Sequence, residues 1–150
     1  LIVILGLGYS KRNEIKKMSN EMNQIGFNIK IIEKSDNLSE YFKQCDFAIT
    51  SNGRTVFELA AMNVPIITIP VNNREKTHSF VKYANVGFQI DPDSKNFETN
   101  FLDSFNKLCS HNIRKKYKEQ LKNIHLLEGV NLVYDIINKK YEEFRKETHI

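Results

Sequence analysis

The sequence predicts an α/β fold in which a parallel sheet is covered by helices on both faces. Over residues 1–92, short apolar runs alternate with amphipathic segments, and this alternation is typical of right-handed crossovers between parallel strands. From about residue 97 to 147 the alternation stops and only helical patterns follow. The predicted strands lie at residues 1–5, 27–32, 46–50, 65–70 and 88–90.

The predicted helices are identified by apolar residues that recur at spacings of three and four. In the first helix, over 12–25, Gly26 follows the last turn and is expected to end it. Shorter helices are predicted near 35–45 and 54–62, and a loop after residue 71 runs into a helix that Gly87 ends. Apolar stripes that we expect to pack in the core are Ile15, Met18, Met22 and Ile25 in the first helix, and Val130, Val133, Ile137, Tyr141 and Phe144 in the last.

The composition is that of one globular domain. Hydrophobic residues make up 41% and charged residues 27% of 150, which excludes extensive disorder, and no apolar run is long enough to span a bilayer. Cys45 and Cys109 lie far apart, so neither a disulfide framework nor a zinc site is expected, and a reducing, cytoplasmic setting is. Because the chain opens inside a strand without a methionine, we expect it to be part of a longer protein.

Candidate ligand-binding residues follow from the sheet. In open parallel sheets, ligands bind beyond the carboxyl ends of the strands. The loops to consider are therefore those that follow the first four predicted strands, at residues 6–11, 33–37, 51–55 and 71–78.

The third of these loops has the composition of a phosphate-binding site. Small residues at a helix N-terminus leave main-chain N–H groups uncovered, and the helix dipole adds partial positive charge there. Glu58, one turn further on, is placed to accept hydrogen bonds from a ribose diol. A capped helix, with Ser51 or Asn52 as the N-cap and Glu58 complementing the dipole, accounts for the spacing equally well. The candidate residues are Ser51, Asn52, Gly53, Arg54, Thr55 and Glu58.

The stretch "CDFAITSNGRTVFELAAMNVPIITIPV" and the "NNREKTHSFVKYANVGFQI" that follows it resemble the C-terminal, Rossmann-like half of the GT-B glycosyltransferase fold. The similarity is to the UDP-sugar hydrolase of the pseudaminic acid pathway and to spore-coat polysaccharide proteins, and more distantly to the N-acetylglucosaminyltransferase that forms lipid II. The shared pattern is D-x-x-I/V-[S/x]-x-x-G-x-T-x-x-E-x-x-x-x-x-x-P. It is matched here by Asp46, Ile49, Gly53, Thr55, Glu58 and Pro65.

The resemblance covers roughly residues 1–140 and departs from the family near its end. The segment "EGVNLVYDII" is similar to the family's closing DG-x-G-x-x-R-[I/V] helix. Asn131 and Tyr134 stand where a second glycine and an arginine are expected. The similarity therefore implies no ligand contact from this closing helix.

The resemblance implies a role for each loop in binding UDP or a UDP-sugar. Glu58 would hold the ribose, and the Ser51–Thr55 loop would face the diphosphate. The donor sugar would contact Asn73, Glu75 and His78, with Arg74 or Lys76 near phosphate and His78 a weak catalytic candidate. The glycine loop of Gly6 and Gly8 would lie near the diphosphate and sugar, and the base would pack on Lys34, Ser35 and Leu38.

The implied function is that of the donor-binding half of an enzyme that transfers or hydrolyses a UDP-linked amino sugar in surface polysaccharide biosynthesis. The N-terminal half-domain, absent from this chain, would supply most of the chemistry, so this half alone is expected to be inactive. No metal motif, carboxylate pair or Cys/His arrangement is visible. The net charge of +4 suits an anionic ligand, but no basic face interleaved with aromatic residues points to nucleic acid.

Two other functions stay open from the sequence. Gly6-x-Gly8 after a strand, with Glu33 at the end of the next, is a partial dinucleotide fingerprint for a NAD-type domain, although Lys11 occupies the third glycine position. The other is a non-catalytic GT-B-like appendage fused to a sugar nucleotidyltransferase.

Overall fold

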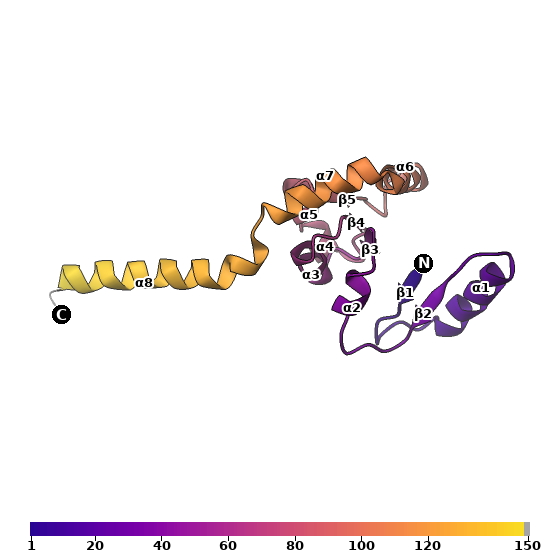
Figure 1. The fold of residues 1–150 in the computed structure, drawn as a ribbon, viewed down its shortest axis with the longest axis horizontal. Coiled ribbons are helices and arrows are strands. Elements are labelled where there is room, and N and C mark those ends of the chain that lie inside the picture. The colour runs from indigo at the N-terminus through magenta and orange to yellow at the C-terminus, as the bar shows by residue number, and fades with distance from the viewer. Residues whose placement is uncertain (149–150) are drawn as a thin grey trace. The chain divides into compact units, whose positions relative to one another are not determined.

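The computed structural model describes residues 1–148, which form two compact units, Leu1–Gln44 and the part of the chain from Cys45 onward (Figure 1). Each unit contains parallel strands that alternate with helices. The predicted α/β class with parallel sheets flanked by helices is therefore confirmed.

The first unit is built around one βαβ crossover. β1 (Ile2–Ile4) and β2 (Lys30–Ile32) pair in parallel, with Val3 opposite Ile31. Between them runs α1 (Arg12–Gln24), and the short α2 (Ser39–Phe42) follows β2. Asn23 fixes the helix to the strand that follows, because its side chain both donates to and accepts from the main chain of Ile29, at 3.0 and 2.7 Å.

The buried face of α1 differs from the predicted stripe. Ser19 is buried and its hydroxyl donates to the carbonyl of Ile29 at 3.3 Å, whereas Met18 and Ile25 are exposed. Ile15 and Met22 of the predicted stripe are half-buried on either side of Ser19. The prediction is therefore right for these two residues and wrong for Met18 and Ile25, and Ser19 was missed because a small hydroxyl residue gives no signal in a hydrophobic pattern.

The second unit contains a three-stranded parallel sheet in the order β3-β4-β5. β3 (Ala48–Thr50), β4 (Ile66–Thr68) and β5 (Gly87–Gln89) are aligned so that Ile49, Ile67 and Phe88 lie side by side. All three residues of β4 are buried, as expected for a central strand covered on both faces.

Helices follow each of these strands. They are α3 (Thr55–Ala61), α4 (Asn73–Lys76), α5 (Phe80–Tyr83), α6 (Phe97–Cys109), α7 (His111–Lys122), the 3-10 turn η1 (Leu126–Glu128) and α8 (Gly129–Thr148).

One core cluster joins the sheet to the C-terminal helices. It contains Ile67 and Ile90 from the sheet region and Leu108 and Tyr117 from α6 and α7. The rings of Phe88 and Tyr117 make an edge-to-face contact, with 5.7 Å between their centroids.

Two details of the second unit correct the sequence prediction. The segment after β4 forms two short helices, α4 and α5, instead of one. Gly87 lies in β5 and does not end a helix; Asn85, with a φ of 52°, is the left-handed residue after α5. Gly87 is required for another reason, because a Cβ at this position would lie 1.8 Å from the carbonyl oxygen of Ile66 in β4.

The prediction that the final stripe packs in a core is wrong for the described residues. Helix α8 forms as predicted, but Val130 is 81% exposed and Ile137 60% exposed, and Val133, Tyr141 and Phe144 are exposed as well. Apolar periodicity indicates a helix face that favours burial. It does not indicate which surface provides that burial.

Gly87→Ala is expected to destabilise the second unit strongly, because the new methyl group collides with the main chain of the central strand. We expect a loss of about 3 kcal/mol or more in the free energy of unfolding, measured by urea denaturation. Gly129→Ala is the matched control: its Cβ meets open space, and a change below about 1 kcal/mol is expected. Equal stability of the two variants would contradict the close approach of β5 to β4.

Candidate ligand-binding loops of the second unit

The loops after β3 and β4 lie at the same edge of the sheet. Thr50 and Thr68, the last residues of the two strands, are paired in a parallel register, so the segments that follow them begin side by side. Ser51–Thr55 belongs to the first loop, and Asn73, Glu75 and His78 to the second. The sheet thus brings together two of the predicted groups of site residues within one unit.

Asn52 is the centre of the contact between these loops. Its side chain is only 2% exposed, and its amide nitrogen donates to the main-chain carbonyls of Glu75, at 2.9 Å, and of His78, at 2.7 Å. The carbonyl oxygen of Asn52 lies 2.7 Å from Nδ1 of His78. Because a carbonyl oxygen only accepts, Nδ1 of His78 carries a proton, and Nε2 is an acceptor whenever the ring is neutral.

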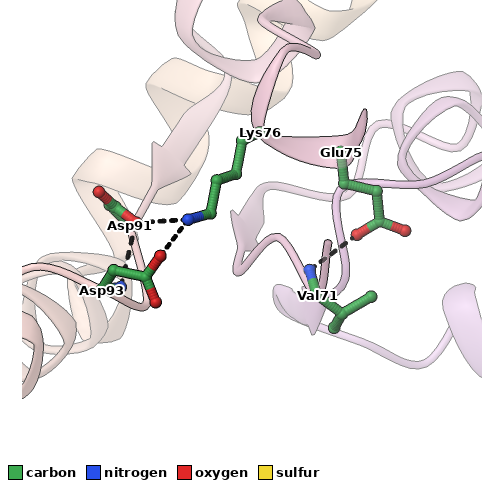
Figure 2. A network of polar contacts seen from close by, with 5 residues as sticks. All are labelled: Val71, Glu75, Lys76, Asp91 and Asp93. Carbon is green, nitrogen blue, oxygen red and sulfur yellow. Dashed lines mark hydrogen bonds and ion pairs between the residues drawn. The ribbon is translucent and has the colours of Figure 1, made fainter. Parts of the chain in front are cut away.

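Glu75 connects the same loops through its carboxylate. Oε2 accepts hydrogen bonds from the main-chain N–H groups of Asn52 and Val71, both at 3.1 Å; the second of these is drawn in Figure 2. Asn72 caps α4 by accepting from the N–H of Glu75 at 2.9 Å. The Asn-x-x-Glu spacing is that of a capping box, in which the glutamate ordinarily accepts from the N–H of the N-cap residue. Here Glu75 accepts instead from Val71, one residue before the N-cap, and from Asn52 in the neighbouring loop.

Gly53 is held next to this carboxylate. A Cβ at Gly53 would lie 3.3 Å from Oε1 of Glu75 and 3.5 Å from the hydroxyl of Ser51. The glycine therefore allows the loop to pass close to Glu75, and its conformation has no positive φ.

The start of α3 is uncapped. Arg54 occupies the N-cap position and no side chain caps it, so the capped-helix reading of Ser51 and Asn52 is wrong. Within residues 1–148, no hydrogen bond engages the main-chain N–H groups of Gly53, Arg54 and Thr55. Uncovered donors at the beginning of a helix attract anions.

Glu58 is exposed in the first turn of α3. No ion pair or hydrogen bond of its carboxylate occurs in the described part of the chain. A carboxylate that is exposed and unpaired beside uncovered N–H groups is available to accept from the hydroxyls of a ligand.

A comparison with protein families matches residues 2–123 to the glycosyltransferase family 28 C-terminal domain. The chain belongs to this family. It is thus a glycosyltransferase donor-binding domain, the C-terminal half of a GT-B fold. No curated protein matches the chain.

In this glycosyltransferase domain, the ammonium group of Lys76 is paired with carboxylates of the protein. Its ammonium group forms ion pairs with Asp93 and, at 3.9 Å, with Asp91, and Figure 2 shows all three side chains. The hydrogen bond with Asp93 raises the pKa of Lys76, against a smaller opposing effect of desolvation. Arg54 and Arg74 are exposed, and Asn73 is exposed without a side-chain hydrogen bond in the described residues.

A pocket of about 520 Å³ opens beside β5 and reaches Lys76 in the loop after β4. Its charged lining residues are Lys76, Lys82 and Asp91, and the buried Oε1 of Gln89 has no hydrogen-bond partner in the described residues. Among the residues assigned to ligand contacts from the sequence, Lys76 alone lines this pocket.

In the first unit, Gly6 and Gly8 have open space where a Cβ would lie, so the fold of this unit does not require glycine at either position. Arg12 folds back over their loop and donates to the carbonyls of Gly6, at 2.8 Å, and Leu7, at 3.1 Å. The space beside these two glycines leaves the main chain of the loop accessible.

The remaining predicted contacts of the first unit lie between β2 and α2. Lys34 is exposed, whereas Ser35 and Leu38 are half-buried. The hydroxyl of Ser35 accepts from the N–H of Asn37 at 3.2 Å, and Asn37 in turn accepts from Ser39 at the start of α2. The main-chain groups of Lys34 and Ser35 are thus set by a hydrogen-bonded turn.

Glu33 is engaged by basic side chains. Lys16 lies 2.8 Å and Arg12 3.7 Å from its carboxylate. The hydrogen bond from Lys16, with the charges of both bases, lowers the pKa of Glu33. A NAD-type domain needs this carboxylate for a ribose, and here it is already paired.

Within residues 1–148, no cluster of three or more His, Cys, Asp or Glu side chains is arranged to hold a metal ion. No helix in this part of the chain is long and apolar enough to cross a membrane.

The contact between the loops after β3 and β4 could not be predicted from the residues of the first loop. The sequence places Asn52 among the residues expected to face phosphate, and nothing in its own loop indicates a buried amide. The signal that was present lies in the other loop, where Asn72 and Glu75 have capping-box spacing.

Asn52→Ala is expected to lower the free energy of unfolding by about 2–4 kcal/mol, because it leaves the carbonyls of Glu75 and His78 without their donor. Asn52→Asp keeps the shape and replaces the donor by an acceptor, so we expect at least as large a loss at pH 7. Asn73→Ala, on the exposed side of the second loop, is the control and should change stability by less than about 0.5 kcal/mol. Urea denaturation measures all three, and a neutral Asn52→Ala would contradict the buried contact.

The lowered pKa of Glu33 predicts a pH effect in the first unit. A carboxylate with a lowered pKa in the folded state stabilises that state above its unfolded pKa, and the contribution is lost as pH falls through the folded value. We expect Lys16→Ala to raise the pKa of Glu33, measured by NMR titration of its side-chain carboxyl carbon. Lys17→Ala, which removes a partner of Glu21, should leave it unchanged; the same titration in all three proteins would contradict the pairing.

Proposed function

We propose that the chain binds UDP or a UDP-sugar, as the donor-binding half of an enzyme that transfers or hydrolyses a UDP-linked amino sugar in surface polysaccharide biosynthesis. In this proposal residues 1–150 form one nucleotide-sugar-binding domain. The family assignment supports the donor-binding role. UDP and the amino sugar rest on the resemblance described for the sequence.

The observation that carries the proposal is the combination at the start of α3. Three main-chain N–H groups, of Gly53, Arg54 and Thr55, have no partner in the described chain, and Glu58 is exposed one turn beyond them. A diphosphate uses donors and a ribose diol uses an acceptor. A nucleoside diphosphate presents both, one next to the other, and so satisfies both groups at once.

The mechanism follows from this placement. Breaking the bond between the anomeric carbon and the diphosphate leaves negative charge on the departing phosphate oxygen. Main-chain N–H groups aimed at that oxygen stabilise the charge as it develops, and they need no reorganisation because the loop already holds them. The donor-binding half anchors the leaving nucleotide, and the N-terminal half provides the acceptor or water and the general base.

The contacts assigned to the other loops are part of the same proposal. Asn73 and His78 would face the donor sugar, and Gly6, Gly8, Lys34, Ser35 and Leu38 would contact the diphosphate and the base. These assignments rest on the resemblance and stay predictions.

We expect the chain to bind UDP more tightly than 2′-deoxy-UDP, because Glu58 accepts from the ribose diol, and to bind NADH weakly or not at all. Glu58→Ala should weaken UDP binding about tenfold and abolish the preference over the deoxy form. Isothermal titration calorimetry measures the affinities. The control is Glu98→Ala, an exposed carboxylate in the first turn of α6, which should leave both affinities unchanged.

Three results would contradict the proposal. NADH could bind more tightly than UDP, UDP could fail to bind, or Glu58→Ala could keep the preference for UDP over its deoxy form. The last result would contradict only the contact between Glu58 and the ribose, because Glu58→Ala leaves the loop proposed to face the diphosphate unchanged.

A further inference from the structure

We propose that Asn52 and Glu75 are positioning residues, which lock the loop after β3 to the loop after β4 and present His78 with an unprotonated Nε2. This inference rests on the proposed function of the same loops. It gives Glu75 a role different from the contact with the donor sugar that the resemblance implies.

The carboxylate of Glu75 is directed at the protein. Oε2 accepts from the N–H of Asn52 in one loop and of Val71 in the other, at 3.1 Å in both cases. Oε1 lies close enough to Gly53 that a Cβ there would be 3.3 Å away. Glu75 is half-buried, and its carboxylate connects the main chain of the loop after β3 with the main chain of the loop after β4.

Asn52 completes the connection from the other side. Four hydrogen bonds among the described residues join it to Glu75 and His78, and they use its N–H, its carbonyl and its side-chain amide. A buried amide is stable only when its hydrogen bonds are made, so the two loops are stable together in this arrangement and not independently.

The connection decides where an anion can bind. The N–H of Asn52 is occupied by Glu75, so the uncovered donors begin at Gly53. The negative charge of Glu75 lies beside Gly53 and disfavours a phosphate oxygen there. The diphosphate is therefore directed toward Arg54 and Thr55, one residue further into the helix start.

His78 is oriented by the same contacts. Its Nδ1–H donates to the carbonyl of Asn52, which fixes the tautomer, and its own carbonyl accepts from the Asn52 amide. The Nε2 that remains is a hydrogen-bond acceptor suited to a sugar hydroxyl. A histidine held by one buried residue at its ring Nδ1 and at its main-chain carbonyl is pre-organised for such a contact.

The test compares Glu75→Ala, Glu75→Gln and the control Glu98→Ala, which removes an exposed glutamate in the first turn of α6. A glutamine oxygen still accepts from both N–H groups, so Glu75→Gln should keep the lock. The probes are UDP and UDP-N-acetylglucosamine, with affinities from calorimetry. Hydrogen exchange of the Asn52 and Val71 amides and the ¹⁵N pattern of the His78 ring are measured by NMR on each protein without ligand.

A positioning role predicts that Glu75→Ala weakens both probes by the same factor, about tenfold, and speeds exchange of the two amides at least about tenfold. Glu98→Ala should stay within about twofold of the unchanged chain. Glu75→Gln should keep slow amide exchange and bind both probes at least as tightly as the unchanged chain, because it keeps the acceptor and removes the charge beside Gly53. A sugar contact predicts instead that Glu75→Ala weakens only UDP-N-acetylglucosamine and leaves amide exchange unchanged; that result would overturn the inference.

The NMR measurements separate this inference from the proposed function. If neither probe binds, the proposed function fails, and slow exchange at Asn52 and Val71 with a proton on Nδ1 of His78 still supports the lock. A His78 ring protonated on Nε2 alone, or equal exchange in the unchanged chain and Glu75→Ala, overturns it. Should Glu75→Ala not fold, the His78 tautomer in the unchanged chain and in Glu75→Gln decides the question.

Discussion

The buried amide of Asn52 is the interaction on which the geometry of the loops after β3 and β4 depends. Parallel pairing of β3 and β4 brings the two loops to one edge of the sheet, but it fixes only where they begin. Beyond the strands, the regular hydrogen bonds of the sheet no longer hold the loops together. Asn52 connects them instead, because its side chain donates to two carbonyls of the opposite loop while its main chain contacts Glu75 and His78.

This arrangement places a negative charge next to a site proposed for an anion. Two main-chain hydrogen bonds hold the Glu75 carboxylate in this position. The exposed guanidinium of Arg54 lies at the start of α3, where it adds positive charge on the other side of Gly53. The charges at the two ends of the short loop thus differ in sign, and an anion is favoured at the helix end of the loop.

Local patterns were sufficient for the elements and insufficient for the contacts between them. The strands of the second unit and helix α3 can be predicted because short segments rich in apolar residues, and the helical spacing between them, are visible within a few neighbouring residues. The partners of Asn52 lie 23 and 26 residues away, and a single sequence carries no record of such pairing. The exposed stripe of α8 shows the same limit, since its periodicity gave the helix and not the surface that covers it.

The contrast between Glu58 and Glu75 shows why residue type alone does not assign a role in such a site. Both are glutamates in the first turn of a helix that follows a strand of the same sheet, and both were assigned to ligand contacts from the sequence. Glu75 follows an asparagine N-cap in a four-residue helix, so its carboxylate reaches the main chain of two loops. Glu58 lies on a helix without such a cap and stays exposed. One carboxylate therefore shapes the two loops, and the other stays exposed, as the ribose contact that we propose requires.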